Sequence, residues 1–159
     1  MWYNERKNEV DMKVAIYGAG AMGTVLGAYI AKAGVDIDLI NRNEKHVAAL
    51  KEKGAHIIGT VDFTQKVNAL LPSEMSEKYD IILLMTKQRY NGEIVAFLKD
   101  YLKEDGALCT CQNGLPEFKI AEMIGAERTL GCAIAWGATF HGEGVSELTS
   151  APDALTFSL

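Results

Sequence analysis

The 159-residue sequence lacks an apolar run long enough to cross a membrane. Its longest unbroken apolar stretches, such as Ile81–Met85, fall far short of the roughly 20 residues that a membrane-spanning helix requires. The first twelve residues, MWYNERKNEVDM, mix both signs of charge and contain no apolar stretch, which excludes a secretory signal peptide. We therefore expect a soluble protein without a membrane partner, in which residues 1–11 are a floppy extension or a remnant of cloning.

The sequence also lacks an excess of basic residues. It has 16 Lys and Arg against 21 Asp and Glu, a net charge of −5, and no visible basic stripe. Nonspecific binding to nucleic acid depends on clustered Lys and Arg, so nucleic acid is not an expected partner. With 48% hydrophobic and 23% charged residues, the composition is that of an ordinary globular protein rather than a disordered or fibrous chain.

Cysteine is scarce, and the odd number of three (Cys109, Cys111 and Cys132) does not suggest a disulfide framework. Such sparse usage favours a reducing compartment, and we expect the cytoplasm. A metal site normally has a fourth ligand and a looser cysteine spacing, so we interpret the three residues as small buried apolar side chains and expect no metal. Tyr90 and Trp136 are interpreted as packing residues.

Short apolar runs alternate with helical stripes over roughly the first 135 residues. This alternation predicts an α/β fold with a doubly wound parallel sheet and right-handed crossovers. Strands are expected at 14–17, 35–39, 81–85, 107–111 and 130–135, and helices at 22–33, 43–50, 94–102 and 115–124. Asn43 is expected to cap the second helix, with His46 on its exposed face, and Gly106 to end the third helix.

Two parts of the sequence depart from this alternation. Residues 55–69 contain β-branched side chains in a less regular pattern and predict short strands or a hairpin. Residues 138–140, 145–148 and 155–159 are separated by turn sequences and predict short antiparallel strands at the C-terminal end of the chain. Because the sequence stops on an apolar strand, we expect a cut at a domain boundary.

A glycine-rich motif, GAGAMG at 18–23, lies directly between the first expected strand and the first expected helix. In that context, G-x-G-x-x-G is typical of a dinucleotide-binding turn. Gly18 allows the tight turn, Gly20 lets a pyrophosphate approach the backbone, and Gly23 lets the helix pack closely. FAD or another nucleotide remains an alternative ligand. The candidate cofactor-binding residues of this turn are Gly18, Ala19, Gly20, Ala21, Met22 and Gly23.

The end of the second expected strand indicates which nicotinamide cofactor is preferred. NAD sites commonly place Asp or Glu about 20 residues after the glycines, whereas NADP sites use Arg on the 2′-phosphate. Here Asp36 and Asp38 come too early, within the strand, and the strand ends at Asn41-Arg42. The guanidinium of Arg42 can hold a phosphate bidentately, so NADP is favoured over NAD. Asn41 could bind ribose with either cofactor.

Taken together, the motifs resemble the ketopantoate reductase family over about residues 12–159. The resemblance rests on KVAIYGAGAMG, LINRN after the second strand, LLMTKQ after the central strand and QNG after the next. It implies a Rossmann-type NADP-binding domain. It also implies that Lys87 and Asn113 contact the nicotinamide ribose and the substrate side of the cofactor, with Gln112 as a further cofactor contact. Lys87 and Asn113 are therefore the candidate catalytic positions.

The resemblance also implies what this chain does not contain. In the family, a lysine general acid and a carboxylate that binds the substrate hydroxyls lie in a helical C-terminal domain, which the sequence does not reach. We therefore expect an NADPH-binding part, nearly inactive alone, of an enzyme that transfers hydride to a 2-keto acid. The expected reaction is 2-dehydropantoate to pantoate, in pantothenate biosynthesis.

Two alternatives stay open. The first is another hydroxyacid or polyol-phosphate dehydrogenase built on the same cofactor domain, and the second is a noncatalytic NAD(P)-sensing module. A severed domain interface would leave an exposed apolar patch, so homo-oligomerisation of the chain is open as well.

Overall fold

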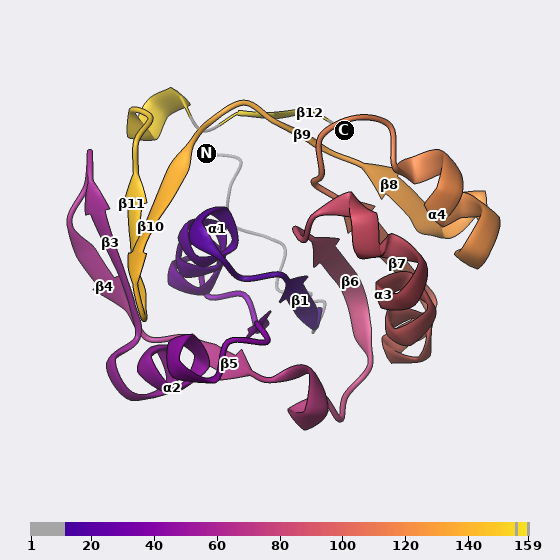
Figure 1. The fold of residues 1–159 in the computed structure, drawn as a ribbon, viewed down its shortest axis with the longest axis horizontal. Helices are drawn as coiled ribbons and strands as arrows, with labels where there is room; N and C mark the ends of the chain where they lie inside the picture. Colours follow the sequence, from indigo (N-terminus) through magenta and orange to yellow (C-terminus); the bar gives the residue numbers. More distant parts are fainter. Residues whose placement is uncertain (1–11, 155, 159) are drawn as a thin grey trace, which may run out of the picture.

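The computed structural model describes residues 12–154 and 156–158, and the expected extension at 1–11 lies outside them. A six-stranded parallel sheet forms the centre of the molecule, in the order β5-β2-β1-β6-β7-β8 (Figure 1). Its strands are β1 (Val14–Tyr17), β2 (Ile37–Ile40), β5 (Asn68–Leu70), β6 (Tyr79–Leu84), β7 (Leu102–Thr110) and β8 (Thr129–Gly131). The sheet confirms the predicted α/β fold of the Rossmann type.

Helices cover both faces of this sheet, with α1 and α2 on one side and α3 and α4 on the other (Figure 1). They are α1 (Ala21–Lys32), α2 (Glu44–Lys53), α3 (Asn91–Leu98) and α4 (Glu117–Ile124). Short 3-10 turns are η1 (Pro72–Glu74), η2 (Gln88–Tyr90), η3 (Lys99–Tyr101), η4 (Ala126–Arg128) and η5 (Pro152–Ala154). Because strand side chains alternate between faces, Ile16 and Ala15 of β1 belong to different hydrophobic cores.

The boundaries of α2 follow the predicted signals. The side chain of Asn43 accepts hydrogen bonds from the amides of Lys45 and His46, at 3.1 and 3.2 Å, which satisfies donors that have no partner within the helix. Gly54 ends the helix with a φ of +80°, a conformation that other residues rarely adopt.

A second sheet packs against α1, so that this helix lies between the two sheets (Figure 1). Its order is β10-β11-β3-β4, from β10 (Ala138–Gly142), β11 (Val145–Leu148), β3 (Ala55–Gly59) and β4 (Phe63–Gln65). The predicted hairpin is β3 and β4. β11 is antiparallel to β10, as predicted, but parallel to β3. A further antiparallel pair joins β9 (Ala133–Ile134) to β12 (Phe157–Ser158).

The segment that follows α3 differs from the sequence prediction. Helix α3 ends at Leu98 and β7 begins at Leu102, so Gly106 lies within the strand and does not end the helix. A Cβ added to Gly106 would lie 2.6 Å from the carbonyl oxygen of Tyr79, and this close approach explains the glycine. The guanidinium of Arg128 donates to the Gly106 and Lys103 carbonyls at 2.9 and 2.7 Å, which secures the irregular stretch.

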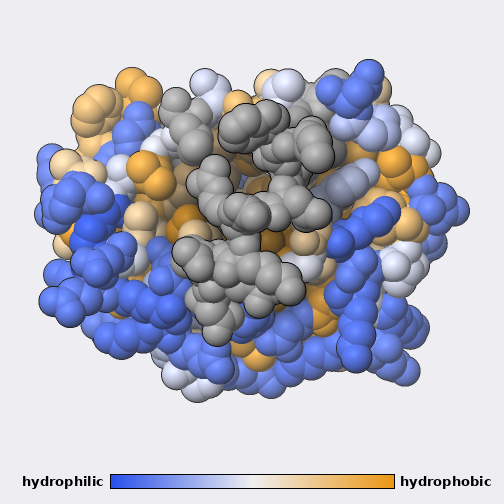
Figure 2. Space-filling model, turned by 180° about the vertical axis from the view of Figure 1, so that it is seen from behind, coloured by the Kyte–Doolittle hydropathy of each residue, from blue (hydrophilic) through white to orange (hydrophobic). Residues whose placement is uncertain are grey.

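The helices of the described ranges include none that is long and apolar enough to cross a lipid bilayer. Figure 2 shows one face of the molecule, on which hydrophilic residues dominate the lower part and apolar residues are visible mainly above it.

Candidate functional site

A cleft of about 640 Å³ opens at the carboxyl ends of β1 and β6. These neighbouring strands lie where the winding of the sheet reverses, the position at which open α/β sheets bind ligands. The cleft brings together five of the predicted site residues: Gly18, Gly20, Asn41, Arg42 and Lys87. Its other lining residues are Tyr17, Ile40, Pro72, Met85, Thr86, Arg89, Tyr90, Glu93 and Ile94.

The glycine turn is shaped by two close contacts. Gly18 has a φ of +101°, and a Cβ there would lie 2.8 Å from atoms of Thr86. A Cβ on Gly23 would lie 2.8 Å from the Gly18 carbonyl oxygen, so this glycine permits α1 to approach the turn. Gly20 differs, because a Cβ at this position meets nothing within 4 Å and would project into open space at the cleft.

The amides of the turn have two different roles. Those of Gly18 and Ala19 both donate to the Ile40 carbonyl at 3.0 Å, and that of Gly20 donates to Gly18 at 2.7 Å, so they hold the turn itself. The amides of Ala21, Met22 and Gly23 lie in the first turn of α1, where a helix offers no internal acceptor. Gly20 supplies no side-chain cap, and the first turn contains no acidic residue. These amides therefore have no acceptor within the helix and can donate to an anion.

The carbonyl oxygen of Ala19 accepts hydrogen bonds from three side chains. The donors are Asn41 Nδ2 at 2.9 Å, Thr24 Oγ1 at 3.2 Å and His46 Nε2 at 2.9 Å. The oxygen of the Asn41 amide accepts from the Asn43 backbone at 2.9 Å. Asn41 thus joins the glycine turn to the start of α2, a structural role that the sequence did not predict.

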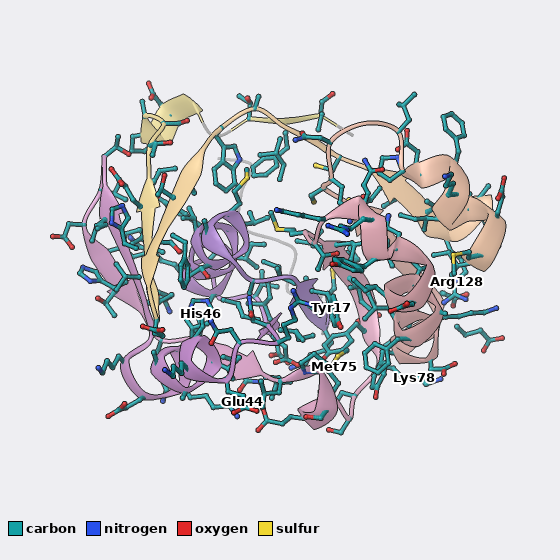
Figure 3. All side chains as sticks on the ribbon, viewed as in Figure 1. Tyr17, Glu44, His46, Met75, Lys78 and Arg128 are labelled. Carbon is teal, nitrogen blue, oxygen red and sulfur yellow. The ribbon has the colours of Figure 1, made fainter. Side chains whose placement is uncertain are left out.

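His46 is buried, with 1% of its surface exposed, so its predicted place on the exposed face of α2 is wrong. The side chain lies between α1 and α2 (Figure 3). The Gly144 amide donates to Nδ1 at 3.0 Å, which leaves Nε2 as the protonated nitrogen that donates to Ala19. Burial lowers the pKa of His46, and the ring is a neutral bridge between the glycine turn and the second sheet.

Positive charge predominates in the cleft. Arg42, Lys87 and Arg89 line it together with a single acidic residue, Glu93. Arg42 is exposed and forms no ion pair with any other described residue. Burial raises the pKa of Tyr17, at the end of β1 (Figure 3), and the charge of Arg42 opposes that rise. The electrostatics of the cleft thus favour an anionic ligand.

A second part of the cleft lining consists of residues that follow β6, beside the glycine turn. The prediction that Tyr90 is a packing residue is wrong, because Tyr90 is 42% exposed and lines the cleft. The guanidinium of Arg89 lies 5.0 Å from the centroid of its ring. Trp136, by contrast, is buried in a hydrophobic core. The position of Thr86, Arg89 and Tyr90 after a central strand was the signal that could have identified them.

Neither Gln112 nor Asn113 belongs to the cleft lining. Gln112 Nε2 donates to the Thr86 carbonyl at 2.6 Å and to Asn91 Oδ1 at 2.9 Å, while Gln112 Oε1 accepts from Asn91 Nδ2 at 2.8 Å. The Asn113 carbonyl accepts from the side chain of Gln88. The side chain of Asn113 is exposed, whereas the amide of Gln112 supports Thr86.

A family model described as "Ketopantoate reductase PanE/ApbA" matches residues 14–159. The chain belongs to this family. The 2-dehydropantoate 2-reductase of Pyrococcus abyssi is 37% identical to this chain over 139 residues, which are 87% of this chain and 45% of that enzyme. The enzyme of the same name from Streptococcus pyogenes is 34% identical over 86% of this chain and 45% of its own length. The chain therefore spans about half the length of these relatives.

Solved structures agree with this assignment. The 2-dehydropantoate 2-reductase of Geobacter metallireducens superposes with a TM-score of 0.79 at 27% identity, over 88% of this chain and 47% of that one. A ternary structure of D-mandelate dehydrogenase with NADH and anilino(oxo)acetate gives a TM-score of 0.79 at 28% identity, over 87% and 46%. The ketopantoate reductase family thus shares both sequence and fold with this chain.

Proposed function

We propose that this chain is the NADPH-binding part of an oxidoreductase that reduces a 2-keto acid, most specifically 2-dehydropantoate to pantoate. One observation carries the proposal: the first turn of α1, without a side-chain cap or an acid, opens beside a cleft with three cationic side chains. The family membership and the named relatives support the choice of substrate.

The residues present fit a nicotinamide dinucleotide. At Gly18 and Gly23 a Cβ would lie 2.8 Å from protein atoms, so glycine is needed to form the turn, and Gly20 leaves open space at the cleft. The amides of Ala21 to Gly23 would hold the pyrophosphate. Arg42 would hold the 2′-phosphate, because the end of β2 carries a guanidinium where NAD sites place a carboxylate.

When bound, the cofactor supplies the hydride. The protein must then orient the ketone and protonate the developing alkoxide. Lys87, exposed at the cleft, would meet the nicotinamide ribose or the carboxylate of the keto acid. Asn113 is exposed but lies outside the cleft lining, and we propose from the family resemblance that it contacts the substrate side of the bound cofactor. We place the general acid in the part of the relatives that this chain does not span. We therefore expect residues 12–159 to bind NADPH but to reduce the keto acid at a very low rate.

The test of the cofactor assignment is calorimetric titration of the chain with NADPH and NADH. Arg42→Ala should weaken NADPH binding by about 10- to 100-fold, because a charge-assisted hydrogen bond to phosphate contributes roughly 1.5–3 kcal/mol to the binding free energy. It should leave NADH binding unchanged. Lys45→Ala is the matched control, because Lys45 is an exposed cation on α2 outside the cleft lining. Equal affinity of the unaltered chain for the two cofactors would refute the role of Arg42.

The structural likeness to D-mandelate dehydrogenase supports a second candidate, an oxidoreductase of another 2-hydroxy acid that uses NADH. A preference for NADH in the same titration would favour this candidate. Because the chain spans about half of its relatives, the substrate is tested in a protein that includes the remaining half, by comparing the reduction of 2-dehydropantoate with that of an aryl 2-keto acid.

A further inference from the structure

Three cysteines gather at the carboxyl edge of the main sheet, outside the cofactor cleft. Cys109 lies near the end of β7, Cys111 directly follows this strand, and Cys132 directly follows β8. Their three Sγ atoms all lie within 4.8 Å of one another. The sequence places Cys109 and Cys111 on one face of a strand with Cys132 able to lie near them, and the parallel pairing of β7 and β8 brings the three together.

The backbone holds this cluster in place. Thr110 pairs with Gly131 in the sheet register, and the Cys132 amide donates to the Thr110 carbonyl at 2.8 Å. The Cys111 amide donates to the Leu84 carbonyl of β6 at 3.0 Å. Cys109 and Cys111 are two residues apart on an extended chain, so their side chains project from the same face. The three thiols therefore converge without a rearrangement of the backbone.

The distances match those of a metal site with three sulfur ligands. A cation bonded to sulfur at about 2.3 Å places the sulfurs of a planar three-ligand site about 4.0 Å apart. Separations of up to 4.8 Å reach this value through small side-chain rotations. Cys109 is 4% exposed and anchors the site from inside, whereas Cys111 and Cys132 are half-buried and leave a path from solvent.

The donor set also indicates which metal fits. Among the residues that the structure describes, the group contains thiols and neither imidazole nor carboxylate. Sulfur ligands of this kind select soft cations, Cu⁺ and Zn²⁺ among them. Zn²⁺ in structural sites takes four ligands in a tetrahedron, while this cluster offers three.

We propose that Cys109, Cys111 and Cys132 form a three-thiolate binding site for Cu⁺. Each sulfur forms a bond to the cation as its thiol proton passes to solvent, and the oxidation state of neither copper nor sulfur changes. None of the three cysteines lines the cleft or is itself a candidate cofactor-binding residue, and the proposal does not depend on the proposed function.

The test is an anaerobic titration of the reduced, metal-free chain with Cu⁺, in competition with a chromophoric Cu⁺ chelator, and in parallel with Zn²⁺. We expect one Cu⁺ per chain, bound at least 10-fold more tightly than Zn²⁺. Cys111→Ser and Cys132→Ser should each weaken Cu⁺ binding by about 100-fold or more. Loss of a residue that only hydrogen-bonds to a metal ligand already lowers metal affinity by about 10- to 100-fold. Met123→Leu, which removes a sulfur outside the cluster, is the control and should bind as the unaltered chain does.

A second measurement does not depend on any variant. Bound Cu⁺ should protect Cys111 and Cys132, the two half-buried cysteines, from alkylation by iodoacetamide in the unaltered chain, and X-ray absorption should show only sulfur atoms bonded to copper. Undiminished Cu⁺ binding by both serine variants, tighter binding of Zn²⁺, or alkylation unaffected by Cu⁺ would each overturn the proposal.

Discussion

Asn91 and Gln112 hold each other through two reciprocal hydrogen bonds between their side-chain amides, at 2.8 and 2.9 Å. Asn91 is the first residue of α3, and Gln112 follows β7, so the pair ties the helix to the edge of the sheet. The same Gln112 nitrogen donates to the carbonyl of Thr86, a residue of the cleft. The Gln112 side chain therefore helps to position Thr86, which lies against Gly18 of the glycine turn.

Replacement of this amide should affect both stability and binding. Gln112→Ala leaves the polar groups of Asn91 and the Thr86 carbonyl without their partner, and we expect a loss of about 1–3 kcal/mol in the free energy of unfolding. Binding of NADPH should weaken as Thr86 shifts. Urea unfolding and calorimetry measure the two effects. The control is Gln65→Ala, because the Gln65 side chain reaches only the carbonyl of its neighbour Lys66. A Gln112→Ala protein with unchanged stability would contradict this role.

The first and second glycines of the turn should respond differently to alanine. Gly18→Ala places a Cβ at positive φ and 2.8 Å from Thr86, so we expect a loss of at least about 1–3 kcal/mol in stability. Gly20→Ala should lower the free energy of unfolding by less than about 1 kcal/mol, because no atom lies within 4 Å of the added methyl group. It should nevertheless reduce NADPH affinity 10-fold or more, since the methyl enters the space proposed for the pyrophosphate.

Thermal unfolding and NADPH titration of the two variants separate these effects. Gly92→Ala in α3 is the control for a glycine replaced in open space, and it should be neutral or slightly stabilising. If Gly20→Ala bound NADPH as tightly as the unaltered chain, the first turn of α1 would not be the pyrophosphate site.

His46 should make stability depend on pH. Its pKa is lowered in the folded protein, so the unfolded chain takes up a proton first as the pH falls. The contribution of His46 to the free energy of unfolding is fully present above the pKa of the unfolded state, about 6.5. It is lost as the pH falls from there through the pKa of the folded state, and the free energy of unfolding decreases by at most about 1.4 kcal/mol per pH unit.

Urea unfolding at pH 7.5 and pH 5 measures this effect. His46→Gln removes the titrating group, and its loss of stability between the two pH values should be smaller than that of the unaltered chain. His56→Gln is the control, because the His56 imidazole is exposed and contacts Asp62 at the surface. Equal losses in the His46→Gln and unaltered proteins would show that His46 is not the group that titrates.

The sequence predicted the main sheet and the glycine turn because both depend on local patterns. An apolar strand, a spaced set of glycines and a helical stripe follow one another within 20 residues, and each element agrees with the next. The position of Arg42 at the end of β2 followed from the same counting.

The errors concern contacts between distant segments. His46 looked exposed because its acceptor Ala19 and its donor Gly144 lie 27 and 98 residues away, beyond any helical periodicity. The engagement of Gln112 with Asn91 depends on how α3 sits on the sheet. Gly106 resembled a helix end, but its close approach to Tyr79 comes from the packing of two adjacent strands.

The parallel pairing of β11 with β3 bears on how the chain folds during its synthesis. It joins residues 145–148 to residues 56–59, so one edge of the β3–β4 hairpin, which ends at Gln65, stays unpaired until about eighty further residues have been made. Such long-range pairing forms slowly and leaves hydrogen-bonding groups available to other chains in the meantime. During synthesis, β11 therefore emerges well after β3, and until then the unpaired edge of β3 is open to pairing with strands of other nascent chains.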